Sequence, residues 1–229
     1  QEEREKALEQ SMDVKRAETD DFSGWLSNDE VSFRGWSLQD NVFIDLTKST
    51  EIGTGKVTFL RVGLFDNTGH ARYSFEQGEE LYIYAELLVK ELIHCPFFGL
   101  VLTDQRNVIV HGKDDLQYDG DLPANVPAGK IIYVMQRLKL DVALGEYSLE
   151  LGLAGMLHSD YEKRSMRNQE EVNATFQRLC HRTKITSFAV LPRKIGVPMQ
   201  IMFHGCCDLP GEIQMKIGNQ KEFDMRDGG

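Results

Sequence analysis

Two segments of the chain alternate polar and apolar residues with a period of two, and this pattern limits the fold more than any other feature. The first segment runs from Gly78 to Glu86 and the second from Gly145 to Ala154. Such alternation is typical of a β-strand that buries one face. Further β-rich segments, Phe97 to Asp104 and Lys130 to Leu140, lie between them and are separated by Gly, Pro and Asp turn signals. The pattern predicts an all-β fold, a compact antiparallel β-sandwich.

The two strands nearest each other in sequence are expected to pair. Lys130 to Leu140 and Gly145 to Ala154 would form a hairpin through Asp141 to Leu144. In the second strand Tyr147 points into the core, and its hydroxyl is expected to bond nearby backbone like the tyrosine of β-sandwich corners. Further strands are predicted at Lys56 to Asp66, Val108 to His111, Ile185 to Leu191, Val197 to Phe203 and Glu212 to Ile217.

The rest of the chain divides around this sandwich, which we assign to residues 55–218. Residues 1–21 are rich in Glu, Lys, Arg and Gln and predict a helical linker or tail. Residues 22–54 carry both tryptophans and are expected to pack aromatic side chains onto the sandwich. Residues 219–229 are predicted to be a disordered tail.

The polar stretch from 159 to 182 interrupts the β pattern. Val172, Phe176 and Leu179 lie at helical spacing, which favours either a short amphipathic helix or an ordered excursion.

Composition and charge exclude several classes of partner. The 229 residues carry a net charge of −10, which argues against nucleic acid and against an anionic membrane surface. No apolar run approaches the roughly 20 residues that cross a bilayer. The four cysteines form no C-x-x-C pair, which indicates a reducing compartment and hence the cytoplasm. The chain begins with Gln, as expected of a fragment or a processed product.

The sequence predicts neither a cofactor nor a metal. Gly53 to Lys56 looks like part of a phosphate loop, but Thr50 and Val57 stand where that motif needs Gly and Ser or Thr. The loop from Lys113 to Pro127 holds four Asp residues and could bind calcium, but it lacks the D-x-D-x-D-G order, so a solvated loop is favoured. His204 with Cys206 and Cys207, and Cys180 with His181, are too close in sequence to chelate one metal well on a strand.

No catalytic residues are predicted. The chain has no Gly-x-Ser-x-Gly elbow. Glu86 and Glu150 are candidates for paired glycosidase carboxylates by position only, and charged residues on an outer strand face are usually solvated. We therefore expect a protein that is not an enzyme.

A binding face for sugar is expected on the outer side of the strand that follows Gly78. Tyr82, Tyr84 and Glu86 share that side and offer aromatic surface together with a polar group. If Lys130 to Leu140 pairs beside this strand, Tyr133 and Arg137 join the same face. Arg137 would suit a phosphate or carboxylate through a bidentate contact. The alternative for each of these residues is an ordinary solvated sheet face that the tyrosines cover.

An ordered set of short motifs resembles the C-terminal domain of Wzt, the ATP-binding subunit of ABC transporters that export O-antigen polysaccharide. The set begins with Leu64 to Gly69, continues with Phe75-x-x-Gly78-Glu79-x-Leu81, and ends with Phe203-His204-Gly205 before Asp208-Leu209-Pro210. The motifs between them are Pro96-x-x-Gly99, Leu100 to Asp104, Val110 to Gly112, Leu144 to Leu149 and Phe188 to Val190.

The resemblance implies an immunoglobulin-like sandwich that recognises the finished, often chemically capped, non-reducing end of a lipid-linked O-antigen polysaccharide. It also implies a homodimer formed by exchange of C-terminal strands, and a place at the inner face of the inner membrane beside the transmembrane subunit. Residues 1–21 would link to a nucleotide-binding ATPase domain of the parent protein. The alternative is a structural or dimerisation module of that subunit without a glycan site of its own. The 159–182 stretch is long for the family.

Overall fold

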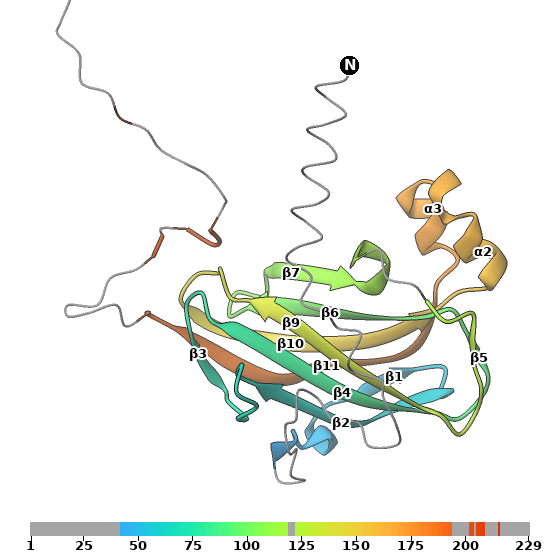
Figure 1. Ribbon diagram of the computed structural model, residues 1–229, viewed down its shortest axis with the longest axis horizontal. Coiled ribbons are helices and arrows are strands. Elements are labelled where there is room, and N and C mark those ends of the chain that lie inside the picture. Colours follow the sequence, from blue (N-terminus) through green and yellow to red (C-terminus); the bar gives the residue numbers. More distant parts are fainter. Residues whose placement is uncertain (1–41, 119–121, 194–201, 204, 209–214, 216–229) are drawn as a thin grey trace, which may run out of the picture.

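The computed structural model describes residues 42–118, 122–193, 202–203, 205–208 and 215. Within them the chain forms two packed β-sheets, with the short helices of residues 158–173 at one end (Figure 1). This is the all-β, antiparallel sandwich that the alternation predicts. The strands are β1 (Glu51–Gly53), β2 (Val57–Phe65), β3 (Ser74–Glu76), β4 (Glu80–Val89), β5 (Ile93–His94), β6 (Pro96–Asp104), β7 (Ile109–Asp114), β8 (Asn125–Val126), β9 (Ile131–Lys139), β10 (Gly145–Gly155) and β11 (Gln177–Leu191).

The two main sheets differ in size. The smaller sheet has three strands in the order β2-β4-β9, and the larger has six, in the order β1-β11-β10-β6-β7 with β3 beside β11. All pairs are antiparallel except β3 with β11, and β5 and β8 form a separate pair. The helices are η3 (Leu46–Lys48), η4 (Asp115–Tyr118), α2 (His158–Glu162), η5 (Arg164–Met166) and α3 (Gln169–Asn173).

Alternating residues of β4 and β10 build the core between the sheets. Leu81, Ile83 and Leu87 of β4 are fully buried in the same cluster as Leu149 and Leu151 of β10. Each such side chain stabilises the fold by about 1.5–3 kcal/mol through removal of apolar surface from water. The period-two pattern therefore identified the core face of both strands, but β4 is buried on its other face as well, where Tyr82 and Tyr84 are 0% and 2% exposed.

The predicted hairpin of β9 with β10 is wrong, because the two strands lie in different sheets. β9 pairs with β4, whereas β10 lies between β6 and β11. The segment that joins them crosses between the sheets and is held by Gln77, whose side chain is 1% exposed and whose Nε2 donates to the Val142 carbonyl at 2.9 Å. The predicted corner tyrosine is confirmed nearby, since the Tyr147 hydroxyl donates to the Ala143 carbonyl at 2.6 Å.

The polar stretch folds as an ordered excursion with short helices. Asn168 and Glu171 form a capping box that starts α3, and the helix ends at Asn173. Leu179 does not continue a helix, because it lies in β11, a strand of 15 residues that begins at Gln177 and pairs with β10. The strand predicted from Ile185 is thus longer than its local pattern indicates.

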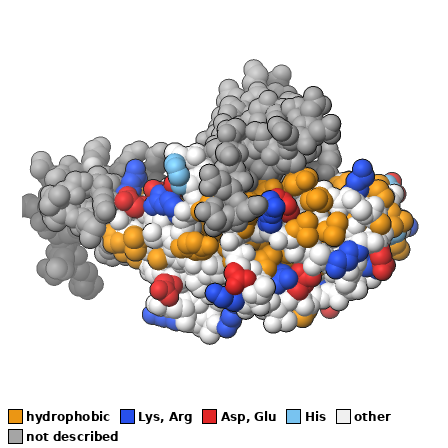
Figure 2. Space-filling view, turned by 90° about the horizontal axis from the view of Figure 1, so that it is seen from below, with side chains coloured by type: hydrophobic (Ala, Val, Ile, Leu, Met, Phe, Trp, Pro, Cys, Tyr) orange, Lys and Arg blue, Asp and Glu red, His pale blue; other side chains and the backbone are white. Residues whose placement is uncertain are grey.

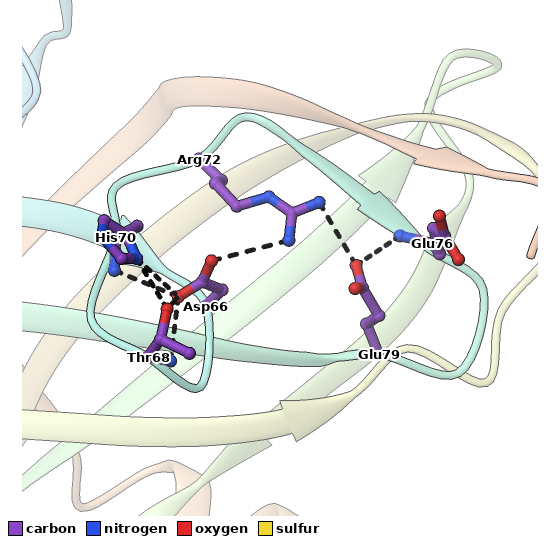
Figure 3. A network of polar contacts seen from close by, with 6 residues as sticks. All are labelled: Asp66, Thr68, His70, Arg72, Glu76 and Glu79. Carbon is purple, nitrogen blue, oxygen red and sulfur yellow. Dashed lines mark hydrogen bonds and ion pairs between the residues drawn. The ribbon is translucent and has the colours of Figure 1, made fainter.

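A polar network ties the end of β2 to the turn before β4 (Figure 3). The Asp66 carboxylate accepts hydrogen bonds from the Thr68 hydroxyl at 2.6 Å and from the His70 backbone at 3.0 Å. Arg72 lies 3.6 Å from Asp66 and 3.5 Å from Glu79. Burial raises the pKa of Asp66, but these hydrogen bonds and the Arg72 charge together outweigh it and lower the pKa from its ordinary value.

The face of the molecule seen from below carries side chains of mixed character (Figure 2). Figure 2 shows Lys and Arg side chains interspersed with Asp and Glu side chains and with hydrophobic patches on the face seen from below. No helix of the described part of the chain is long and apolar enough to span a membrane. All four cysteines are free; Cys95 and Cys180 are buried, and Cys206 and Cys207 are exposed. Several predictions lie outside the described residues: the helical linker, the 219–229 tail, and most of the two strands predicted at Val197 to Phe203 and Glu212 to Ile217.

Candidate functional site

The five predicted binding residues do share one face of the smaller sheet. β4 and β9 pair in a register that sets Tyr82 opposite Arg137 and Glu86 opposite Tyr133. Tyr84 lies between them on the same side of β4. The structure therefore brings together the residues that the sequence analysis selected.

The rings of Tyr82 and Tyr84 on this face are not exposed, which corrects the expectation of an open aromatic surface. Tyr82 is 0% and Tyr84 2% exposed, and they pack with Phe65 and Phe43. Phe43 reaches them because the Ile44 backbone N–H donates to the Val62 carbonyl at 2.8 Å, which lays residues 42–44 along the edge of β2.

Neighbouring carboxylates already bind the tyrosine hydroxyls. Tyr82 donates to Glu80 at 2.8 Å and Tyr84 to Glu86 at 2.7 Å. Burial and the Glu86 carboxylate both raise the pKa of Tyr84. Arg137 lies 3.6 Å from Glu80. The exposed aromatic surface contributed by these five residues is that of Tyr133, which is 37% exposed.

The larger sheet carries a groove on its outer face. The groove has a volume of about 500 Å³ and crosses β7, β6, β10 and β11, with α3 and the segment after it at one end. Its floor contains Gly99, Gly112 and Gly152, and Gly99 lies directly opposite Gly152 in the β6–β10 register. Residues alternate between the faces of a strand, so these glycines face away from the core that Leu100 and Leu151 help to form.

The glycines keep the floor open. A Cβ atom at Gly152 would lie 3.0 Å from His181 Nδ1, and one at Gly99 would lie 3.0 Å from the Asp114 Cβ. Both distances are tighter than ordinary van der Waals contact. Glycine inside a strand commonly marks a place where a ligand or another backbone approaches closely.

Polar side chains line the groove above this floor. Glu150 of β10 lies 3.3 Å from His181 Nε2 of β11, so the pair bridges two neighbouring strands. The Asp114 carboxylate accepts from the Gln117 backbone at 3.2 Å. Burial raises the pKa of Asp114, and hydrogen bonds from the Gln117 and Leu116 backbone oppose that rise. Carboxylate, imidazole and amide groups in one depression can exchange hydrogen bonds with several hydroxyls.

Aromatic side chains form one end of the groove. Phe97 of β6 and Phe176, which follows α3, contact each other with ring centroids 4.7 Å apart. The arrangement combines an apolar wall with convergent polar groups, as small-molecule and sugar sites do.

A family comparison decides what kind of domain carries this groove. Residues 48–209 match the model of the Wzt C-terminal domain. The chain belongs to the Wzt C-terminal domain family. The matched range contains both sheets, the groove and the helical excursion.

Among solved structures, the fold is similar to the crystal structure of the C-terminal domain of Wzt. That structure has a TM-score of 0.53 and 13% sequence identity, and the match covers 71% of this chain and 89% of the other. At this identity the likeness concerns the fold alone. No curated protein matches the sequence.

Membership of the Wzt family gives the domain a role in the O-antigen ABC transporter. There it is the non-catalytic C-terminal domain of a transporter subunit. The resemblance found in the motifs is thereby confirmed. Sequence reasoning did not find the groove of this Wzt domain, although two signals were present. Gly99, Gly112 and Gly152 interrupt three different strands, and Glu150 stands on an outer face.

Proposed function

We propose that this Wzt domain binds the non-reducing end of a lipid-linked O-antigen polysaccharide in the groove of the larger sheet. Binding there would give the transporter its specificity for a finished, often capped, chain. The family supports the transporter role, and the groove supports the binding role.

The observation that carries the proposal is the combination of an open glycine floor with polar walls. A sugar ring presents a C–H face and a rim of hydroxyls, so it needs close backbone approach, apolar contact and fixed hydrogen-bonding groups. Gly152 offers the close approach, Phe176 the apolar contact, and Glu150 with His181 the polar groups. The face that carries Tyr82 and Tyr84 offers less, because the rings of these two tyrosines are covered.

The proposed setting follows from the same assignment. The domain would act in the cytoplasm at the inner face of the inner membrane, beside the transmembrane subunit. It would form a homodimer, with exchange of C-terminal strands as the expected mode. ATP hydrolysis would belong to a nucleotide-binding domain of the parent protein, and this domain would need no cofactor or metal.

The first experiment measures binding of the 229-residue chain to purified O-polysaccharides, with intact chains compared with chains whose terminal cap has been removed. Saturable binding that requires the intact end is the expected result. Equal binding of intact and stripped chains would contradict recognition of the end.

Gly112→Leu tests the groove with little strain, because a Cβ at Gly112 meets its nearest atom, Val101 Cγ2, at 3.6 Å. The leucine side chain should fill the groove and reduce affinity by about a hundredfold, which corresponds to about 2.7 kcal/mol. Ser187→Leu is the matched control, since Ser187 lies on β11 outside the groove lining. Thermal unfolding of both variants should match the parent.

The predicted face of the smaller sheet supplies the competing site. The double variant Tyr133→Ala/Arg137→Ala removes its exposed aromatic ring and its guanidinium. Unchanged binding is expected. Loss of binding in this variant, with binding retained in Gly112→Leu, would move the site to that face. A folded chain that binds no O-polysaccharide would favour the structural or dimerisation module.

A further inference from the structure

A smaller cavity continues the groove beneath the helical excursion. It has a volume of about 210 Å³ and shares Asp114, Gln117 and Phe176 with the groove. Its other walls include Arg164 of η5 and Arg167, which follows it. A ligand whose ring lies in the groove can therefore extend a substituent into this side cavity.

The two arginines are held in place by their own contacts. The Arg164 guanidinium lies 3.8 Å from the centroid of the Tyr161 ring, and its Nη1 donates to the Tyr161 carbonyl at 2.9 Å. Arg167 Nη1 donates to Asp160 Oδ1 at 2.9 Å. A guanidinium has five N–H donors, so these contacts leave others for a ligand. Their fixed positions reduce the entropy lost on binding.

The walls of the groove and the side cavity together carry more cations than anions. Lys113, Arg164, Arg167 and Arg178 line them, against the carboxylates of Asp114 and Glu150 in the walls and of Asp160, which pairs with Arg167. Among the described residues, neither Arg164 nor Arg178 has a carboxylate at ion-pair distance. This local excess of positive charge occurs in a chain with a net charge of −10.

We infer that the side cavity binds an anionic substituent, a carboxylate or a phosphate, of a sugar whose ring lies in the groove. The inference rests on the proposed glycan-binding function and adds the chemical class of the glycan. Arg164 and Arg167 would each donate charge-assisted hydrogen bonds to this substituent. The planar, forked guanidinium group matches the geometry of carboxylates and phosphates.

The experiment compares matched forms of the same polysaccharides. O-polysaccharides that contain uronic acid are tested before and after reduction of their carboxylates to alcohols, and phosphate-bearing ones before and after dephosphorylation. Neutral O-polysaccharides form a third arm. We expect the acidic form of one class to bind about tenfold more tightly than its neutralised partner, with a preference that falls as salt rises.

The double variant Arg164→Gln/Arg167→Gln should lose that preference and keep the affinity for the neutralised form. Arg164→Lys, which keeps the charge, should retain part of it. Arg106→Gln is the control, because Arg106 lies in the exposed turn between β6 and β7. Thermal unfolding reports whether the variants remain folded.

Two results would overturn the inference. Equal binding of acidic and neutralised forms to the parent chain, or an unchanged preference in the double variant, would show that the side cavity does not bind an anionic substituent. If Gly112→Leu nevertheless abolished binding of the polysaccharide, the proposed glycan-binding function would hold without the anionic side cavity. Absence of binding to every polysaccharide by the folded chain would overturn both.

Discussion

The outer faces of the two sheets differ in how far other side chains cover them. On the smaller sheet, the tyrosines of β4 lie beneath Phe43, and their hydroxyls are bound by carboxylates two residues away in sequence. On the larger sheet, glycines leave a depression that Glu150, His181 and Asp114 line with partly exposed side chains. Aromatic residues on an outer strand face thus turned out to be part of the packing. Small residues, which contribute no contacts themselves, mark the accessible surface.

Phe43→Ala is the largest expected disturbance of the covered face. Phe43 is half-buried against Phe65 and Tyr84, with ring centroids 6.4 and 5.8 Å away. We expect a loss of about 2–3 kcal/mol, below the 3–5 kcal/mol typical of fully buried phenylalanine. Denaturant unfolding measures it. A loss below about 0.5 kcal/mol would show that residues 42–44 do not cover this face in solution.

Asp66→Asn tests the polar network at the end of the smaller sheet. Hydrogen bonds to a charged carboxylate contribute about 1.5–3 kcal/mol each, so we expect a loss of about 2 kcal/mol near neutral pH. The folded pKa is lowered, so this stabilisation is present above the ordinary carboxyl pKa and disappears as pH falls through the folded value. The parent and variant should therefore converge in stability in acid. Unfolding measured from neutral pH down to strongly acidic pH checks this, and a constant difference would refute the sign.

Glu150→Gln tests the open face with little change of shape. Loss of the charge should lower polysaccharide affinity by about tenfold, because a charge-assisted acceptor for hydroxyls becomes a neutral amide. Stability should change by less than about 1 kcal/mol, since the contact between Glu150 and His181 is partly exposed. Calorimetric titration and thermal unfolding separate the two effects. A large loss of stability without loss of affinity would make Glu150 a structural residue.

Tyr84→Phe should have the smallest effect. It removes one hydroxyl and its bond to Glu86 but keeps the packed ring. The expected cost is about 1 kcal/mol in stability, with no change in polysaccharide binding. Reduced affinity in this variant, with folding intact, would return the smaller sheet to consideration as the binding face.

Local patterns in the sequence predicted much of this domain. The alternation of Leu81, Ile83 and Leu87 with Tyr82 and Tyr84 assigned each residue of β4 to the correct face, because neighbouring side chains of a strand point to opposite sides. The motif order also led to the correct family.

The candidate site was less accessible to such reasoning. The groove depends on Gly99 lying opposite Gly152 and on Phe176 lying against Phe97. These are contacts between residues far apart in sequence, and the residue pattern within one strand does not determine which strands lie beside it. Residues 22–54 were expected to pack aromatic side chains on the sandwich, but the pattern could not tell that Phe43 would cover the selected tyrosines.

By itself, then, the sequence determined that the chain forms β-strands, which residues of each strand share a face, and that the Tyr147 hydroxyl bonds nearby backbone. Only the tertiary structure decided which strands are neighbours and which outer face stays open. The reason is that a period-two pattern equally suits a hairpin within one sheet and a crossing between two. The choice for β9 and β10 is settled by the burial of Gln77 and the pairing of β9 with β4, both of which exist only in the folded chain.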